Sequence, residues 1–415
     1  MNINMIQIKK LVMSRKEQKL YETKPIGSAI KFKRKEMNMT LEEGAEGICS
    51  VSYLSKLENN LIEPGEQFVD SLTKRFGLQD FYEEHQDTYV SDFTQIIEHL
   101  TMGSTPQNDL MLNYQERRDY QAQLIQMGYH TILKNSEQAM KSFHDLKMYL
   151  PNLRHDEFTL FLILSNIYLY QENRHSEAYE LLLMAAKFEH LPQNLVLLLL
   201  KWRLLNAFRM HKISEVFNHY PVYVNMVVDI EHYQLLQEIR NEYVQFEAYF
   251  QSPKNMEKTL SKMNSLSLAD KNHAQAKSLF FHQRYEDVIR LAKPYYRQYS
   301  QWLVLYLMSL DYAKKHNEIS VLLSNTNELS DLCNTSKLLI AHLKYKYKSD
   351  KEQLLSYLRR EILGVKHLTD EYHVLDYLMV DAQHLFSTHQ HYKEAVQVTT
   401  HYLPRLKTLK KSDLI

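Results

Sequence analysis

The distribution of glycine constrains the fold of this chain more than any other feature of its sequence. Five of the eight glycines lie within residues 27–77, and only Gly103, Gly128 and Gly364 follow them. Phosphate-binding loops and tight turns use glycine where the backbone adopts a positive φ or closely approaches a ligand. The last three-quarters of the chain therefore lacks the signature of a nucleotide-binding α/β domain, and we expect helices joined by short polar turns.

Apolar residues recur at helical spacing from about residue 111 onward, and no run of strict alternation indicates a strand. Prolines punctuate this pattern, as expected where helices begin or end. These prolines are Pro151, Pro192, Pro221, Pro253, Pro294 and Pro404. The sequence therefore predicts an all-α fold.

A short polar segment that begins a helix recurs along this region. It starts at His175, Ile213, Tyr285 and Tyr392, and the intervals of 38, 72 and 107 residues are close to one, two and three units of about 36. Tetratricopeptide repeats have a nominal period of ~34 residues. We therefore expect a right-handed α-solenoid of tetratricopeptide-like repeats with a concave binding surface, and an irregular helical domain is the alternative.

Charge and cysteine content indicate a reducing, aqueous environment. Lys and Arg together number 50, as do Asp and Glu, but residues 1–35 contain ten basic residues and two acidic ones. This basic segment can neutralise DNA phosphates, although residues 1–24 alone also fit a solvated tail. The two cysteines form no CxxC pair, and no apolar run has the length of a signal peptide or a membrane span. We expect a cytoplasmic protein without membrane association.

Residues 26–78 have the pattern of a helix-turn-helix domain. The pattern predicts helices over residues 26–36, 41–48, 51–57 and 66–76, with Gly77 at the last C-terminus. Thr40 and Glu43 form a capping box at the second helix. Arg34 and Glu58 are expected to form a structural ion pair between the first and third helices.

The third helix is the expected DNA-reading helix, with Leu54 and Leu57 anchoring it to the core. Hydroxyl groups, an aromatic ring and a lysine suit contacts to phosphates and base edges. We expect Asn59 and Asn60 to form a positive-φ turn whose amides can meet a phosphate. The residues expected to contact DNA are Lys31, Ser50, Val51, Ser52, Tyr53, Ser55, Lys56 and Asn59.

This domain resembles the XRE (Cro/repressor-like) helix-turn-helix family, and ICSVSYLSKLEN is similar to the subgroup found in peptide-sensing regulators. Gly44 departs from the resemblance because the family has a leucine-like core residue there. Glycine in a helix costs roughly 1 kcal/mol relative to alanine, so this position should weaken the domain.

An XRE domain followed by tetratricopeptide-like repeats resembles the Rgg, Rap, NprR, PlcR and PrgX family of Gram-positive bacteria, and NprR is the most similar in length and architecture. The resemblance implies a quorum-sensing homodimer that binds double-stranded operator DNA and a short, imported signalling peptide. The expected domains are a basic extension over 1–24, a helix-turn-helix domain over 25–88, a linker helix and turn over 89–110, and a repeat domain over 111–415 for peptide binding and dimerisation.

Polar side chains inside predicted first helices of the repeats suit an extended peptide backbone, because amides offer both a donor and an acceptor. Arg203 can bind a peptide carboxylate. Ordinary solvent-facing polar residues are the alternative interpretation. The residues expected to bind the peptide are Asn166, Arg203, Asn206, Gln237, Asn241 and Gln245.

Two other functions fit the same sequence. One is a DNA-binding regulator controlled by a protein partner, such as an anti-repressor or a polymerase subunit. The other is a bifunctional regulator that also acts on a response-regulator phosphorelay. The sequence contains no nucleophile elbow, P-loop or metal-binding motif, so we expect no enzymatic activity, no cofactor and no metal.

Overall fold

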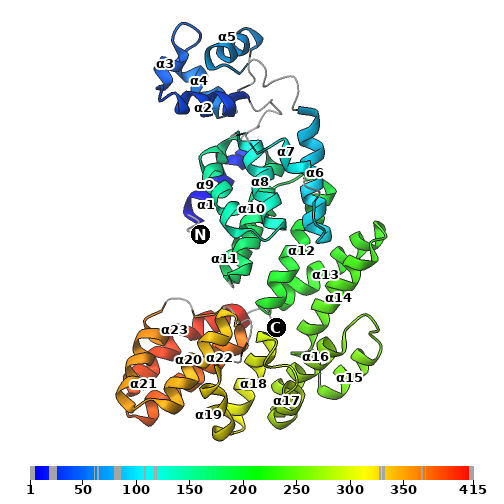
Figure 1. The fold of residues 1–415 in the computed structure, drawn as a ribbon, viewed down its shortest axis with the longest axis vertical. Helices are drawn as coiled ribbons and strands as arrows, with labels where there is room; N and C mark the ends of the chain where they lie inside the picture. Colours follow the sequence, from blue (N-terminus) through cyan, green and yellow to red (C-terminus); the bar gives the residue numbers. More distant parts are fainter. Residues whose placement is uncertain are drawn as a thin grey trace. The chain divides into compact units, whose positions relative to one another are not determined.

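The computed structural model describes residues 5–17, 26–59, 61–62, 65–78, 86–106, 109–115, 117, 119–172, 174–326, 329, 332–365, 368–369 and 371–410. All regular elements within these residues are helical, which confirms the all-α prediction. The chain forms two compact units (Figure 1). The first comprises residues 1–172 and 177–203, and the second comprises residues 173–176 and 204–415.

Four helices near the N-terminus enclose a small core of their own. They are α2 (Ile26–Glu36), α3 (Leu41–Ala45), α4 (Val51–Glu58) and α5 (Glu66–Phe76). Their core contains Ile26, Ala29, Ile30, Ala45, Leu54, Leu57, Leu72, Phe76 and Leu78. The predicted bounds of α2 and α5 are confirmed, and α4 is one residue longer than predicted.

The predicted capping box is present at the start of α3. The Thr40 hydroxyl accepts a hydrogen bond from the Glu43 amide at 3.2 Å, and the Glu43 carboxylate accepts one from the Thr40 amide at 2.7 Å. Helix α3 ends at Ala45, three residues before the predicted end. The chain turns there because Gly47 adopts a left-handed conformation with φ of 71°.

Two helices outside this bundle pack into the core of the first unit, and one of them is the helix expected in the linker over 89–110. Helix α1 (Met5–Glu17) places Ile8 and Val12 in the hydrophobic core that the later helices of the first unit form. Helix α6 (Gln86–Met102) contributes Phe93 and Ile96 to the same core. The core of the first unit therefore includes residues of α1 and α6 together with residues of the helices that follow residue 111.

The remaining helices of the first unit follow α6 in the chain, and among them α8 contacts α6, α9 and α10. Gly128 permits the close approach of α6 and α8, because a Cβ atom there would lie 2.6 Å from the Ile96 side chain. These helices are α7 (Asp109–Leu112), α8 (Tyr120–Ile132), α9 (Ser136–Leu146), the 3-10 helix η1 (Lys147–Asn152), α10 (His155–Gln171), α11 (His175–Ala185) and α12 (Gln193–Arg209), which ends in the second unit.

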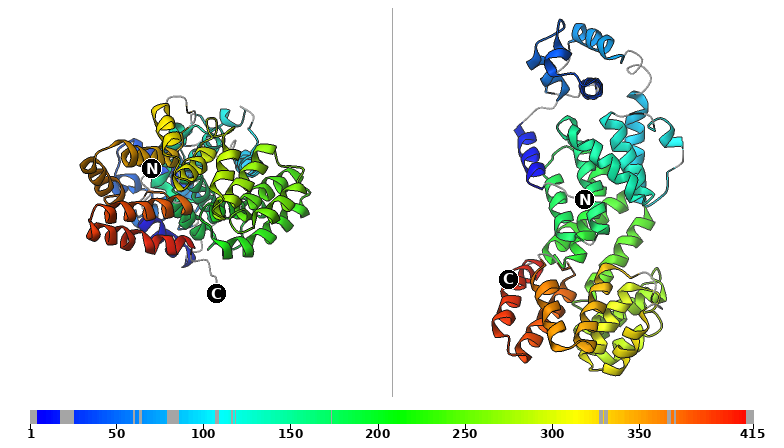
Figure 2. Two further views of the ribbon diagram at one scale, coloured as in Figure 1. Left: turned by 90° about the horizontal axis from the view of Figure 1, so that it is seen from below. Right: turned by 60° about the vertical axis from the view of Figure 1, so that its left-hand side comes forward.

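The second unit continues the pattern of helix pairs. Its helices are α13 (Ile213–Asp229), α14 (Tyr233–Glu247), α15 (Pro253–Ser261), α16 (Leu268–Phe281), α17 (Tyr285–Ala292), α18 (Ser300–Tyr312), α19 (His316–Ser324), α20 (Asn334–Lys348), α21 (Lys351–Tyr357), the π-helix η3 (Leu358–Leu363), α22 (Tyr372–Thr388) and α23 (Tyr392–Lys410). Figure 2 shows the orange and red helices at the end of this unit packed beside one another.

The helices confirm the repeat that the sequence predicts. The first helices of the pairs begin at residues 120, 155, 193, 233, 268, 300, 334 and 372, and so recur every 32 to 40 residues. The four predicted repeat starts are the first residues of α11, α13, α17 and α23. First helices also contact one another, as α14 contacts α16 and α16 contacts α18, so polar residues on several of them are brought to one region.

The turns between paired helices use positive φ without glycine. The residue two positions before the second helix is left-handed in several pairs. These residues are Lys134, His211, Gln283, Lys314 and Gln390, with φ between 53° and 66°. Glycine is scarce in this part of the chain because residues with side chains adopt the left-handed conformation in these turns. This conformation costs such residues roughly 1–2 kcal/mol each.

Replacing one of these residues by glycine should stabilise the chain. Lys314 is exposed and has φ of 57°. We expect Lys314→Gly to raise the free energy of unfolding by roughly 0.5–1 kcal/mol, because relief of strain exceeds the added entropy of the unfolded chain. Asn317→Gly, in the exposed face of α19, should lower it by a similar amount. Urea unfolding measures both, and a loss of stability in Lys314→Gly would contradict this account.

Candidate functional site

The helix-turn-helix bundle is organised around one buried ion pair. Arg34 on α2 donates from Nε to Glu58 Oε1 at 2.6 Å and from Nη2 to Glu58 Oε2 at 2.8 Å. Its Nη1 donates to the Met39 carbonyl at 2.7 Å. Only 9% of the Arg34 side chain and 3% of the Glu58 side chain are exposed. The hydrogen bonds to Glu58 raise the pKa of Arg34, and the paired charges fix the end of α4 to α2.

Gly44 makes room for the stem of this arginine. A Cβ atom at position 44 would lie 2.8 Å from Arg34 Cδ and 3.1 Å from Leu54 Cδ2. The leucine-like residue that the XRE resemblance implies at this position would collide with Arg34. The prediction that Gly44 only weakens the domain is therefore incomplete, because this glycine also permits the buried pair.

Helix propensity and packing make opposite predictions for Gly44→Ala. Propensity alone would stabilise α3 by roughly 1 kcal/mol. We expect a net loss of roughly 1–2 kcal/mol, because the added methyl group must displace Arg34 from Glu58. Chemical denaturation measures the change, and Glu42→Ala on the exposed face of α3 is the control, expected within about 0.5 kcal/mol of wild type. A gain in stability for Gly44→Ala would show that Arg34 can move aside without losing its hydrogen bonds to Glu58.

Helix α4 presents a polar face that no other part of the bundle covers. Leu54 and Leu57 are buried, whereas Val51, Ser52 and Lys56 are exposed. Ser50 caps this helix, since its hydroxyl accepts a hydrogen bond from the Tyr53 amide at 3.1 Å. The cap determines where α4 begins, and Ser55 is half-buried on the following turn. Val51, Ser52 and Lys56 therefore form an exposed surface on the predicted reading helix.

Tyr53 is held inside the domain. Its hydroxyl accepts a hydrogen bond from the Gly65 amide at 2.9 Å, and its ring lies 4.7 Å from that of Phe68. The side chain therefore connects α4 to the beginning of α5. Its predicted DNA contact stays a prediction, and a substitution that removes the ring would also disturb this connection.

Lys31 and Asn59, both predicted to contact DNA, are bonded to each other. Lys31 Nζ donates to Asn59 Oδ1 at 2.9 Å, and Asn59 Nδ2 donates to the Ser55 carbonyl at 2.8 Å. Burial lowers the pKa of Lys31. The positive φ predicted for Asn59 is wrong, because its φ is −107°. Asn60, the other residue of the predicted turn, lies outside the described residues.

Sequence reasoning missed two contacts that support the reading helix. Arg75 on α5 donates to the Glu46 carbonyl at 2.6 Å and so caps the end of α3. Asn152 of η1 donates from Nδ2 to the backbone carbonyl of Glu58. The second contact connects a helix of the later core to the end of α4. No local pattern indicates it, because 94 residues separate the partners.

The predicted peptide-binding residues belong to both units, with Asn166 and Arg203 in the first and the others in the second. In the first unit, Asn166 on α10 has no exposed surface, and neither polar atom of its amide group has a hydrogen-bond partner within the described residues. Arg203 on α12 is half-buried. In the second unit, Asn206 on α12 is fully buried. Their binding of a peptide stays a prediction.

The three predicted residues on α14 differ in their surroundings. Gln237 is exposed and Asn241 is half-buried. Gln245 Oε1 accepts hydrogen bonds from Lys277 Nζ at 3.1 Å and interacts with His273 Nδ1 at 3.0 Å. Sequence reasoning missed these two basic residues on α16. Their spacing of four residues, which places both on one face of a helix, is the signal that could have found them.

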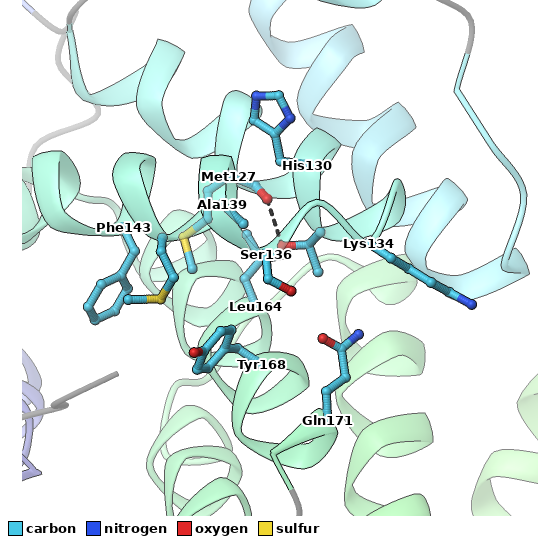
Figure 3. Close-up of a pocket in the computed structure, with 11 residues that line it drawn as sticks. Met127, His130, Lys134, Ser136, Ala139, Phe143, Leu164, Tyr168 and Gln171 are labelled. Carbon is cyan, nitrogen blue, oxygen red and sulfur yellow. Dashed lines mark hydrogen bonds between the residues drawn. The ribbon is translucent and has the colours of Figure 1, made fainter. Parts of the chain in front are cut away.

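A small hollow in the first unit is not large enough for a peptide side chain. It lies between α8, α9 and α10, and Figure 3 shows Tyr168 and Gln171 at one side of it. The Thr131 hydroxyl donates to the Met127 carbonyl at 2.7 Å on its wall. Its volume of about 10 Å³ is that of a single water molecule.

Comparisons with known proteins agree with the geometry of the N-terminal bundle. Residues 30–81 match the family described as helix-turn-helix. The chain is 31% identical over 102 residues to the transcriptional activator NprA of Geobacillus stearothermophilus, and the match covers 22% of this chain and 25% of that protein. The chain thus matches about a quarter of its relative's length. No solved structure matches the chain. The N-terminal bundle is a helix-turn-helix DNA-binding domain of the XRE type.

Within the described helices, none is long and apolar enough to cross a membrane. The parts of the chain that the structure describes also contain no group of three or more His, Cys, Asp or Glu side chains arranged to hold a metal ion.

Proposed function

We propose that this protein is a cytoplasmic transcription regulator that binds operator DNA through α4 and is switched by a short imported signalling peptide. The observation that carries the proposal is the exposed face of α4, whose orientation the buried pair of Arg34 and Glu58 fixes. In helix-turn-helix proteins the residues near the start of the second helix of the motif contact base edges in the major groove. Val51 and Ser52 occupy such positions, and Lys56 lies one turn after Ser52 on the same exposed face of α4.

The chemistry of these side chains suits double-stranded DNA. The Ser52 hydroxyl can bond to phosphates or to base edges, and Val51 can contact a thymine methyl group. Lys56 can reach guanine or a phosphate. Proteins with this motif commonly bind as dimers to paired half-sites, and we propose that this chain acts as a homodimer.

Loss of the Lys56 charge should weaken DNA binding without affecting folding, because this side chain is exposed on α4. We expect Lys56→Ala to reduce affinity for a duplex selected by the wild-type chain by roughly 1–3 kcal/mol if the lysine reads a base. If it contacts only a phosphate, the loss should be equal for all duplexes and the salt dependence should fall by about one charge.

Fluorescence anisotropy with a labelled duplex, at several salt concentrations, measures this effect. Lys74→Ala removes an exposed charge from α5 and is the matched control, expected to retain wild-type affinity. Equal affinities for the wild-type chain and Lys56→Ala would exclude Lys56 from the interface.

The proposed peptide site lies on the first helices of the helix pairs. An extended peptide presents unpaired amide and carbonyl groups, and side-chain amides can bond to both kinds of group. Asn206 and Asn241 lie on α12 and α14 of the second unit, and the Oδ1 atom of Asn241 has no hydrogen-bond partner within the described residues. Similarity to the activator NprA supports a regulatory role, and the peptide is the signal that the family resemblance implies.

Asn241 provides the sharper test of this site because Asn206 is fully buried. We expect Asn241→Ala to weaken peptide binding by roughly 1–3 kcal/mol while DNA affinity without peptide stays unchanged. The measurement is calorimetric titration of the full-length chain with peptides of about five to ten residues encoded by a neighbouring reading frame.

Gln234→Ala, at an exposed position of the same helix, is the matched control. Binding of one peptide per subunit to the wild-type chain and to Gln234→Ala, with weaker binding to Asn241→Ala, would support the proposal. Failure of every candidate peptide to bind the wild-type chain would favour control by a protein partner.

A further inference from the structure

A desolvated lysine in the second unit lies among other basic groups. Lys277 on α16 is only 8% exposed. Its amine donates to the neutral Gln245 Oε1 at 3.1 Å and lies 5.3 Å from the centre of the Tyr249 ring. It forms no salt bridge with any residue that the structure describes. An amine removed from water without an opposite charge is unfavourable, so this site lacks a partner.

Further basic side chains lie around Lys277, on α16 itself and on two other helices or their ends. His273 lies one turn earlier on α16 and is 4% exposed. His211, just after α12, packs edge-on against Tyr249 with ring centres 4.0 Å apart, and His373 on α22 lies 5.8 Å from the same ring. Arg209 at the end of α12 is close enough to disfavour the charged form of Lys277.

The two carboxylates near Lys277 interact with other side chains and not with its amine. Glu242 on α14 lies 4.0 Å from Arg209. Glu371, just before α22, accepts a hydrogen bond from the Thr335 hydroxyl at 2.7 Å, and its other oxygen lies 3.8 Å from His373. Both attract Lys277 from a distance, but neither contacts its amine.

The protonation of these groups agrees with their geometry. Burial, followed by the repulsion from Arg209, lowers the pKa of Lys277 to about 7. Burial lowers the pKa of His211 and His273 well below the ordinary value and that of His373 to about 4. A ligand that brings a negative charge would therefore restore the full charge of Lys277 at neutral pH.

We propose that Lys277, together with Arg209, binds a carboxylate group of the ligand of this unit. This inference rests on the proposed function, since the carboxylate is assigned to a short peptide, either at its C-terminus or in an acidic side chain. A carboxylate that accepts a charge-assisted hydrogen bond from Lys277 would replace the weaker bond to the Gln245 amide oxygen. Gln245 Nε2, which donates to the Asp270 carbonyl at 2.9 Å, fixes the direction of that oxygen.

Three small molecules distinguish the possible sources of the carboxylate. N-acetylalanine carries a terminal carboxylate, N-acetylaspartic acid α-amide carries only a side-chain carboxylate, and N-acetylalaninamide carries neither. We expect at least one acid to raise the melting temperature of the full-length chain at pH 7 and constant ionic strength, by roughly 1–2 °C at four times its Kd. The amide should produce no such rise.

Three variants assign the effect to this site. Lys277→Met keeps the length of the side chain and should abolish the response to the acids, while Lys271→Met on the same helix should respond like the wild-type chain. Gln245→Glu places a carboxylate beside the Lys277 amine. We expect this variant to melt at a higher temperature in the absence of the added acids and to lose the response to them, because the introduced carboxylate already pairs with the Lys277 amine.

Equal responses to an acid and to the amide, or a wild-type response in Lys277→Met, would overturn the inference. Peptides that bind in calorimetry with an affinity independent of their carboxylates would also overturn it, while the proposed function would stand. If the acids bind at Lys277 but no candidate peptide binds, the carboxylate site stands and the peptide-sensing proposal fails.

Discussion

The helix-turn-helix domain depends on the buried pair of Arg34 and Glu58. Both charges are removed from water, so the loss of either partner would leave an uncompensated charge at a cost of roughly 3–5 kcal/mol. Gly44 leaves space for the arginine stem, and Asn152 binds the carbonyl of Glu58 itself. The pair thereby fixes α4 so that Val51, Ser52 and Lys56 face away from the core.

Local rules in the sequence predicted the elements of this domain, because caps, apolar spacing and terminal glycines act within a few residues. The bounds of α2 and α5 and the capping box at Thr40 followed from them. The role of Gly44 did not, since it depends on an arginine ten positions earlier in the chain. Burial of Ile8 and Val12 likewise depends on distant helices, and no local pattern indicates it.

The candidate ligand site in the second unit also combines features that are local in the sequence with features that are not. The helical repeat was predicted from four polar helix starts, and Gln245 was predicted as one of the peptide-binding side chains on the first helices. Its partners Lys277 and His273 lie on the next first helix, so only the stacking of α14 on α16 brings them together. The repeat in the sequence thus predicts the series of helix pairs. The chemistry of a site depends on which side chains of successive first helices come into contact, and the repeat alone does not predict these contacts.

Selection of binding sites from a pool of random duplexes tests most directly whether α4 reads DNA. The wild-type chain and a Ser52→Arg variant should each enrich a defined sequence, and the two sequences should differ at a small number of adjacent base pairs. A variant at exposed Ser71 of α5 should select the wild-type sequence. If no sequence is enriched, or if Ser52→Arg selects the same bases as the wild-type chain, α4 is not the reading helix.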